Sequence, residues 1–289
     1  MDQMNYTAPQ PQPTQPVYAQ GCLGAAWADI KATPGYVGKL LVLGLIMCVP
    51  ILNFVVLGYL LHWSREVPFG GKTPMPAKYV TGKNFEFGFY AFVIGLVVGL
   101  IVGVAGMILG VVPVLGWIAY MALALAGSVA ISLMEMRMIM GYTLGDGFNV
   151  KDIWQVARRN VGQLLLVTLV PGIVATAIVS VVGGVVITLA LLLGLGGAMP
   201  SILASSYASS VSAADVFSIV GLIAGPTLFA VLLVYVAGMI VETAANAITV
   251  RGLGHWVARY APEWTALAMP AAPVQPTPGY PQNPGTPLQ

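Results

Sequence analysis

The sequence predicts an all-α fold, a polytopic transmembrane helical bundle with interfacial amphipathic helices. Hydrophobic residues make up 58% of the 289 residues and charged residues only 8%, whereas a soluble domain carries about 25% charged residues. So few charges could not cover the surface of a compact soluble particle, which excludes a soluble globular domain, a coiled coil and an extended disordered chain. The net charge of +2 gives no sign of nucleic-acid binding.

Five long apolar runs lie between the two ends of the chain. Each is longer than the roughly 18 apolar residues needed to cross a hydrocarbon layer about 30 Å thick. Apolar residues occupy nearly every position instead of alternate positions, so we expect helices and not the strands of a barrel. The runs cover 39–62, about 89–112, about 115–134, about 162–195 and about 217–241.

Both ends of the chain are rich in proline, which removes backbone donors and blocks helix formation. We therefore expect disordered tails at 1–20 and 262–289, on either side of a helical membrane domain at 21–261. The tails are either solubilising spacers or ligands for a cytoplasmic partner.

The membrane domain contains one short, weakly similar internal repeat, GKLL at 38–41 and GQLL at 162–165. Each copy follows an amphipathic stretch and precedes an apolar run that contains proline. This repeat would be explained by two half-units of the same orientation, about 25–145 and 149–260, as in transporters built from parallel repeats.

Residues 149–161 predict an amphipathic helix with apolar side chains on one face and polar side chains on the other. Asn149 is placed to cap its start. A basic amphipathic helix with a tryptophan at its border is expected to lie flat in the membrane interface. Residues 23–33 look like a shorter version that ends at Pro34-Gly35. The residues assigned to the longer interfacial helix are Lys151, Trp154, Arg158 and Arg159.

Lysine and arginine are concentrated in the connection after the first run, the connection before the fourth run and the C-terminal flank of the fifth. By the positive-inside rule these parts, and with them both tails, are predicted to be cytoplasmic. The connections at 113–116 and 198–216 carry no lysine or arginine and are predicted to face outside. The expected localisation is the cytoplasmic membrane, as a multi-pass protein.

The first run is the exception to this alternation, because basic residues flank both of its ends. One crossing cannot place both ends in the cytoplasm. Pro50 removes a backbone donor and Asn53 offers replacement polar groups. We expect a hairpin of two half-length helices that enters the membrane and returns at Pro50. The alternative is one kinked crossing with the N-terminal tail outside.

The second run carries a glycine at every fourth position, a pattern that places the glycines on one side of a helix. Such a stripe lets another helix backbone approach closely, either within the chain or in a homodimer. We call these residues the glycine stripe: Gly95, Gly99 and Gly103.

Prolines interrupt the fourth and fifth runs at Pro171-Gly172 and at Pro226. We expect a kink or break in the helix at each. Broken helices sometimes form the binding sites of transporters, which makes transport one reading of this feature. Proline kinks are also common in membrane helices that bind nothing.

Ionisable side chains within the apolar runs are few, and the candidates are Glu135, Arg137 and Glu242. All three lie near an expected cytoplasmic boundary, so an anchoring or salt-bridge role competes with a substrate or proton role. His62 and His255 stand alone along the sequence, so we expect no metal site. No catalytic or nucleotide-binding motif is present, and we expect neither a catalytic residue, a cofactor nor an enzymatic activity.

Several short stretches carry a resemblance to a known family: GKLL at 38–41, VPILN at 49–53, LGYLL at 57–61, PMP at 74–76, Phe87-Gly88 and FNVKDI at 148–153. They resemble a bacterial and archaeal membrane family catalogued as domain of unknown function 4013. Ala77-Lys78-Tyr79 departs from the pattern, since the family usually has a tryptophan there. The resemblance covers about 25–260 and implies a prokaryotic membrane protein, without assigning an activity, a substrate or site residues.

These observations predict an integral membrane protein that is not an enzyme. It would organise lipid or bind partners through its cytoplasmic tails. The alternative is a transporter of a small solute or a lipid, for which a polar-lined cavity reaching the membrane midplane would be the sign. The expected partners are membrane lipids, a second copy of the chain and a cytoplasmic protein bound by the tails, but not nucleic acid.

Overall fold

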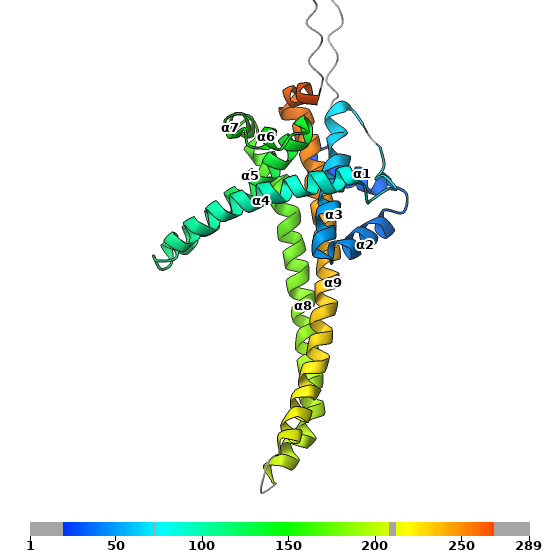
Figure 1. Ribbon diagram of the computed structural model, residues 1–289, viewed down its shortest axis with the longest axis vertical. Helices are drawn as coiled ribbons and strands as arrows, with labels where there is room; N and C mark the ends of the chain where they lie inside the picture. The colour runs from blue at the N-terminus through cyan, green and yellow to red at the C-terminus, as the bar shows by residue number, and fades with distance from the viewer. Residues whose placement is uncertain (1–19, 72, 208–211, 269–289) are drawn as a thin grey trace, which may run out of the picture.

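The computed structural model describes residues 20–71, 73–207 and 212–268, and this part of the chain is all-helical (Figure 1). Four of its helices, α4, α5, α8 and α9, are long and apolar enough to cross a membrane. The prediction of an all-α polytopic membrane fold is confirmed. The elements are α1 (Cys22–Ala32), α2 (Tyr36–Met47), α3 (Pro50–Arg65), η1 (Val67–Phe69), α4 (Gly82–Leu109), α5 (Leu115–Gly141), α6 (Leu144–Gly147), α7 (Val150–Ala157), α8 (Val161–Ser206), α9 (Ala213–Tyr260) and η2 (Pro262–Ala268).

The long helices form two hairpins, α4–α5 and α8–α9, which leave a common centre in different directions (Figure 1). We call this centre the hub. It consists of α1, α3, η1, α6, α7 and η2 together with the adjoining ends of α4, α5, α8 and α9. The largest buried side chains, Trp63, Trp256 and Trp264, lie there. The packed core is therefore at one end of both hairpins and not along them.

The cationic connections all meet at the hub, whereas the turn at 110–114 and the end of α8 with the start of α9 lie at the far ends of the hairpins (Figure 1). The sequence there, at 110–114 and 207–212, contains no lysine or arginine. Positive charge is thus gathered at one end of the molecule, the arrangement that the positive-inside rule requires of a polytopic protein. Which side of the membrane holds the hub stays a prediction.

The α8–α9 hairpin is much longer than a bilayer is thick. Its helices have 46 and 48 residues, which corresponds to about 70 Å at 1.5 Å per residue, against a hydrocarbon layer of about 30 Å. Its tip is polar, since Ser212 and Asp215 form a capping box at the start of α9. The hairpin must therefore tilt strongly or extend beyond the hydrocarbon layer.

The first apolar run forms two short helices with a break between them, and whether the run crosses the membrane or returns at Pro50 stays a prediction. α2 ends at Met47 and α3 begins at Pro50, where the missing N–H falls in the first turn of a helix and costs nothing. Asn53 lies in that first turn, and its backbone N–H donates to the Val49 carbonyl at 3.1 Å. The hydroxyl of Tyr235 on α9 donates to the free Cys48 carbonyl at 3.1 Å, so α9 holds the break in place.

The helix is not broken at Pro171, Gly172 or Pro226, because α8 and α9 stay helical through all three positions. The kinks expected there stay a prediction. A proline removes one backbone hydrogen bond, and the helix on both sides of it is held by the partner helix of the hairpin.

The two proposed half-units differ in the length of the helix that carries the repeated tetrapeptide. α2 and α8 each begin just before the repeated tetrapeptide, but α2 ends after 12 residues and α8 continues for 46.

The glycine stripe on α4 is not a packing surface within the described chain. A Cβ placed at Gly95, Gly99 or Gly103 would meet nothing within 4 Å. The reason is that α5 packs on a different side of α4, where Tyr120 fills the space above Gly106. The prediction of intramolecular packing is therefore wrong, and contact with a second copy stays a prediction.

Close helix approach occurs instead where α3 crosses α4. A Cβ at Gly58 would overlap the backbone carbonyl of Asn84, and one at Gly88 would overlap the carbonyl of Phe54. The two glycines therefore let the helix backbones touch. α2 meets α9 in the same way, with Gly44 against the backbone of Ile240.

The C-terminal tail begins later than predicted, because residues 262–268 form η2. Trp264 is 1% exposed, and its indole N–H donates to Asp152 on α7 at 3.0 Å. Glu263 pairs with Arg159 at 2.7 Å. The predicted tail at 1–20, apart from Gln20, and the remaining tail at 269–289 lie outside the described residues.

We predict that Gly58→Ala lowers the free energy of unfolding by about 1–3 kcal/mol, because the added methyl group overlaps the backbone of α4. Gly99→Ala is the matched control. It lies in open space, and alanine is the better helix former by about 1 kcal/mol. Thermal unfolding midpoints in detergent measure both changes, and equal midpoints for the two variants would contradict this packing.

Candidate functional site

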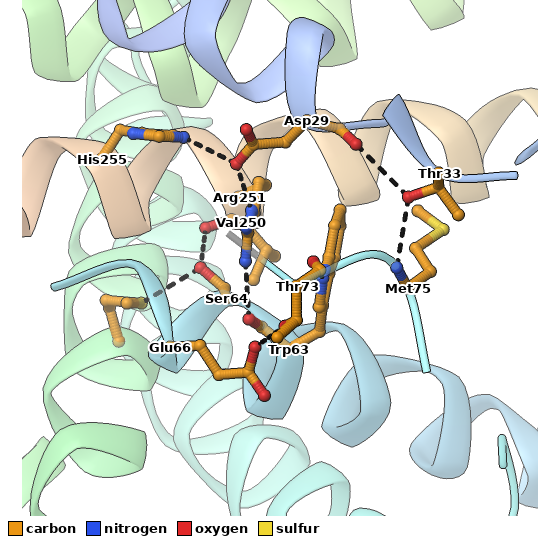
Figure 2. A network of polar contacts seen from close by, with 11 residues as sticks. Asp29, Thr33, Trp63, Ser64, Glu66, Thr73, Met75, Val250, Arg251 and His255 are labelled. Carbon is orange, nitrogen blue, oxygen red and sulfur yellow. Dashed lines mark hydrogen bonds and ion pairs between the residues drawn. The ribbon is translucent and has the colours of Figure 1, made fainter. Parts of the chain in front are cut away.

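Three ionisable side chains meet inside the hub and form what we call the polar cluster: Asp29 on α1, and Arg251 and His255 on α9 (Figure 2). Arg251 Nε donates to Asp29 Oδ2 at 2.7 Å. His255 Nε2 lies 2.9 Å from the same oxygen. Residues four apart share one face of a helix, so α9 presents the guanidinium and the imidazole to a single carboxylate.

Arg251 is the centre of the cluster and its side chain is 0% exposed. Its Nη1 donates to the Trp63 carbonyl at 2.8 Å, and its guanidinium carbon lies 4.3 Å from the centre of the Trp63 ring. Such stacking satisfies the face of the guanidinium, while its edge takes hydrogen bonds. Nη2 has no hydrogen-bond partner within the described ranges.

Hydrogen bonds between uncharged groups lie on either side of the ion pair (Figure 2). Thr33 donates to the backbone carbonyl of Asp29 at 3.3 Å and accepts the N–H of Met75 at 3.1 Å. Ser64 donates to the carbonyl of Val250. These bonds connect α1, α3, α9 and the segment after η1, so the cluster joins elements that are far apart in the sequence.

The environment keeps Asp29 ionised. Burial by itself would raise the pKa of Asp29, but the hydrogen bond from His255 and the charge of Arg251 outweigh it and hold the pKa below its ordinary value. With the carboxylate ionised, both neighbours act as donors to it. His255 Nδ1 is buried and lacks a partner among residues 20–71, 73–207 and 212–268.

This geometry is that of an anchor. Within the described residues, no third imidazole, thiol or carboxylate joins Asp29 and His255 to complete a set of metal ligands. The guanidinium is fully enclosed, so nothing from outside can reach it without moving a helix. A buried ion pair of this kind gives a fixed register to the elements that it connects.

Of the ionisable candidates from the sequence, Arg137 is also an anchor. It is buried and forms an ion pair with Asp152 at the start of α7, and its guanidinium carbon lies 5.4 Å from the centre of the Trp264 ring. Asp152 therefore accepts from both α5 and η2. Arg137 thus fixes the interfacial helix and the C-terminal turn against α5.

Glu135 and Glu242 do not join this network. Glu135 is half-buried on α5, Glu242 is exposed on α9, and neither has a hydrogen-bond or ion-pair partner among the residues described. A salt bridge, one of the alternatives considered for Glu135, is therefore not formed there. The structure does not bring the three candidates together into one site.

The predicted interfacial helix is α7, and the Asn149 side chain caps it by accepting the N–H of Asp152 at 3.3 Å. Its apolar face is divided between two environments. Ile153 and Val156 are buried in the hub, whereas Trp154 is 62% exposed. The guanidinium carbon of Arg158 lies 5.4 Å from the centre of the Trp154 ring.

The other two assigned residues of this helix also differ from one another. Lys151 is exposed on α7, and no side chain of the described residues pairs with it. Arg159 bonds the Tyr260 carbonyl at 2.7 Å and Glu263 at 2.7 Å. Arg159 is therefore committed to the hub, and Lys151 and Arg158 are the cations that α7 presents outward.

A comparison with family models gives one result for this chain. Residues 42–190, just over half of the chain, match the family described as "Protein of unknown function (DUF4013)". The chain belongs to this family. The resemblance seen in the sequence is confirmed. Neither the curated proteins nor the solved structures gave a match.

The region of the DUF4013 match contains α3, α4, α5 and α7 but neither α1 nor α9. The polar cluster therefore lies outside the matched range. Sequence reasoning treated His255 as isolated and overlooked Asp29. The available signal was Arg251 and His255 at helical spacing in an apolar helix, because two such groups require a buried counter-charge.

We predict that Asp29→Asn lowers the free energy of unfolding by about 3–5 kcal/mol, because it leaves Arg251 buried without its counter-charge. Glu86→Gln serves as the control, since it removes one exposed carboxylate that only accepts a hydrogen bond from Tyr90. Its effect should stay within about 0.5 kcal/mol. Chemical unfolding in detergent, followed by circular dichroism, measures both, and an equally small effect of Asp29→Asn would rule out the anchor.

The stability that Asp29 contributes should depend on pH in a defined direction. Because the folded pKa of Asp29 is lowered, its contribution is fully present above the unfolded pKa, about 3.9, and is lost as the pH falls through the folded pKa. The difference in unfolding midpoint between the wild type and Asp29→Asn should be constant from pH 7 to 5 and shrink below about pH 4. A constant difference down to pH 3 would contradict this assignment.

Proposed function

We propose that this DUF4013 protein is a non-enzymatic protein of the prokaryotic cytoplasmic membrane that organises the lipid around two hairpins. One observation carries the proposal: the hairpins present large apolar side chains outward along most of their length. Leu100 on α4 is 67% exposed and Leu193 on α8 is 73% exposed. In the most apolar part of each long helix, between 6% and 17% of the residues are buried.

Exposed apolar surface on this scale requires lipid as its surroundings. Each Å² of apolar surface left in water costs about 25 cal/mol, and contiguous apolar patches of this size are not tolerated on soluble proteins. Since α4–α5 and α8–α9 diverge from the hub, lipid must cover both sides of each hairpin. The protein therefore orders more lipid than a compact bundle of the same four helices would.

The cavities support lipid organisation over solute transport. Three of them lie against the hairpins and are lined almost entirely by apolar side chains. A cavity of about 510 Å³ with polar walls, which include His62, Glu66 and Lys83, lies beside the hub at the start of α4. A polar wall at the hub does not supply a path along the hairpins for a hydrated solute.

The same proposal includes the orientation of the protein in the membrane and a role for its proline-rich tails. With the cationic hub in the cytoplasm, the first and the last described helices lie on that side, because α1 and η2 both belong to the hub (Figure 1). A cytoplasmic partner bound by the proline-rich tails would then be tethered next to the membrane.

We predict that fluorophores on both hairpins are quenched by phospholipids that carry bromine on their acyl chains. Leu100→Cys and Leu193→Cys place the label on α4 and α8, after Cys22 and Cys48 are replaced by alanine. Gln155→Cys, exposed on the polar side of α7, is the matched control and should stay unquenched. Absence of quenching at Leu100→Cys would contradict the proposal that lipid surrounds both hairpins.

The same vesicles separate organisation from the transport alternative. Fluorescent phospholipid present in both leaflets should be bleached by an external reductant to about half, as in protein-free vesicles, because an organiser does not move lipid headgroups across the hydrocarbon layer. Bleaching well beyond the protein-free level would support a lipid transporter and overturn the proposed function.

A further inference from the structure

An apolar groove of about 580 Å³ lies between the two hairpins, where α5 and α8 come together below α7. α5 contributes Leu125, Val129 and Leu133 to its walls, and α8 contributes Leu165 and Leu169. No polar side chain of α5 or α8 lines it. A cavity with such walls takes up hydrocarbon more readily than water.

The length of the groove matches one leaflet of a bilayer. Its wall on α5 extends from Ala122 to Met134, which is about 18 Å at 1.5 Å per residue. One leaflet contributes half of a hydrocarbon layer of about 30 Å. The groove can therefore hold an extended acyl chain from one leaflet, with the headgroup at the end that α7 closes.

The α7 end of the groove is cationic and lacks a counter-charge. Trp154 and Arg158 both line this end. The nearest acidic residue along α7, Asp152, is already occupied by Arg137 and Trp264. Arg158 stacks on Trp154 but has no acidic partner in the described segments. Aromatic and basic side chains together at the end of an apolar surface are typical of the lipid headgroup level.

We propose that this groove binds one anionic phospholipid, with an acyl chain between α5 and α8 and the headgroup phosphate against Arg158. This inference rests on the proposed function, because it needs the hairpins to be in lipid. Arg158 supplies a charge-assisted hydrogen bond to the phosphate, and Lys151 on the same helix adds the positive potential that favours a net negative headgroup. The site is thus selective by charge at its end and unselective along its walls.

Native mass spectrometry of the full chain in detergent tests the site. The probes are phosphatidylglycerol, which is anionic, and phosphatidylcholine, which has no net charge. The wild type should retain one phosphatidylglycerol in preference to phosphatidylcholine. Arg158→Gln should weaken phosphatidylglycerol binding about tenfold, the loss of one charge-assisted hydrogen bond. Arg159→Gln is the matched control, since it removes the same charge one residue along but from a side chain paired with Glu263.

A second pair of variants tests the walls. Ala126→Phe fills the groove and should abolish retention of both lipids. Ala119→Phe adds the same ring to α5 at an exposed position outside the groove and should retain both lipids as the wild type does. Equal unfolding midpoints for the two variants verify that Ala126→Phe is folded. If it is not, Ala130→Leu, a smaller change in the same wall, takes its place.

Two results would overturn the site. One is retention of phosphatidylglycerol by Arg158→Gln or Ala126→Phe at the wild-type level. The other is a dimer of the wild type that Ala126→Phe dissociates, which would identify a second copy of the chain as the occupant. In either case, quenching of the labels on both hairpins would show that the proposed function stands without this site.

Discussion

Arg251 imposes a constraint on the whole hub, because a guanidinium that is fully buried must be neutralised and hydrogen-bonded where it lies. The structure meets this requirement with Asp29, 222 positions away, and with the carbonyl and ring of Trp63. α1, α3 and α9 can satisfy these contacts in one register only. The same register brings Gly254 against Ser64, where a Cβ would meet the hydroxyl and the carbonyl at 2.7 Å.

The contrast between the hub and the hairpins follows from what surrounds each. In the hub, charges, indoles and backbone carbonyls bond across elements, and the methionines at the end of α5 are buried on every side because α3, α6, α7 and η2 enclose that end. Along the hairpins there is little hydrophobic gain from helix association, since lipid is as apolar as leucine. Specific long-range contacts therefore fix the hub, and the positions of the hairpin tips are set by neighbouring lipid as much as by protein.

The parts of this structure that the sequence predicts are those with a local cause. The apolar runs, the break at Pro50 and the cap at Asn149 each depend on residues within one or two turns. The polar cluster depends on a pairing of Asp29 with Arg251 and His255 that no local pattern encodes. The glycine stripe fails for a related reason: glycine spacing shows that a helix could approach closely, but not whether one does. Proline likewise lowers the stability of a helix without deciding, by itself, whether a partner helix compensates.

α7 connects the two environments, and this double role limits how either can change. Ile153 and Val156 bind it into the hub, and Asp152 holds Arg137, while Trp154 and Arg158 face the groove from the next positions along the same helix. A helix this short cannot rotate toward lipid without withdrawing Asp152 from Arg137, which would leave a buried charge unpaired. The orientation of Trp154 and Arg158 is therefore set by the protein before any lipid binds. A cationic end held in this way needs no reorganisation on binding, and preorganisation of this kind lowers the free-energy cost of holding a single lipid in place.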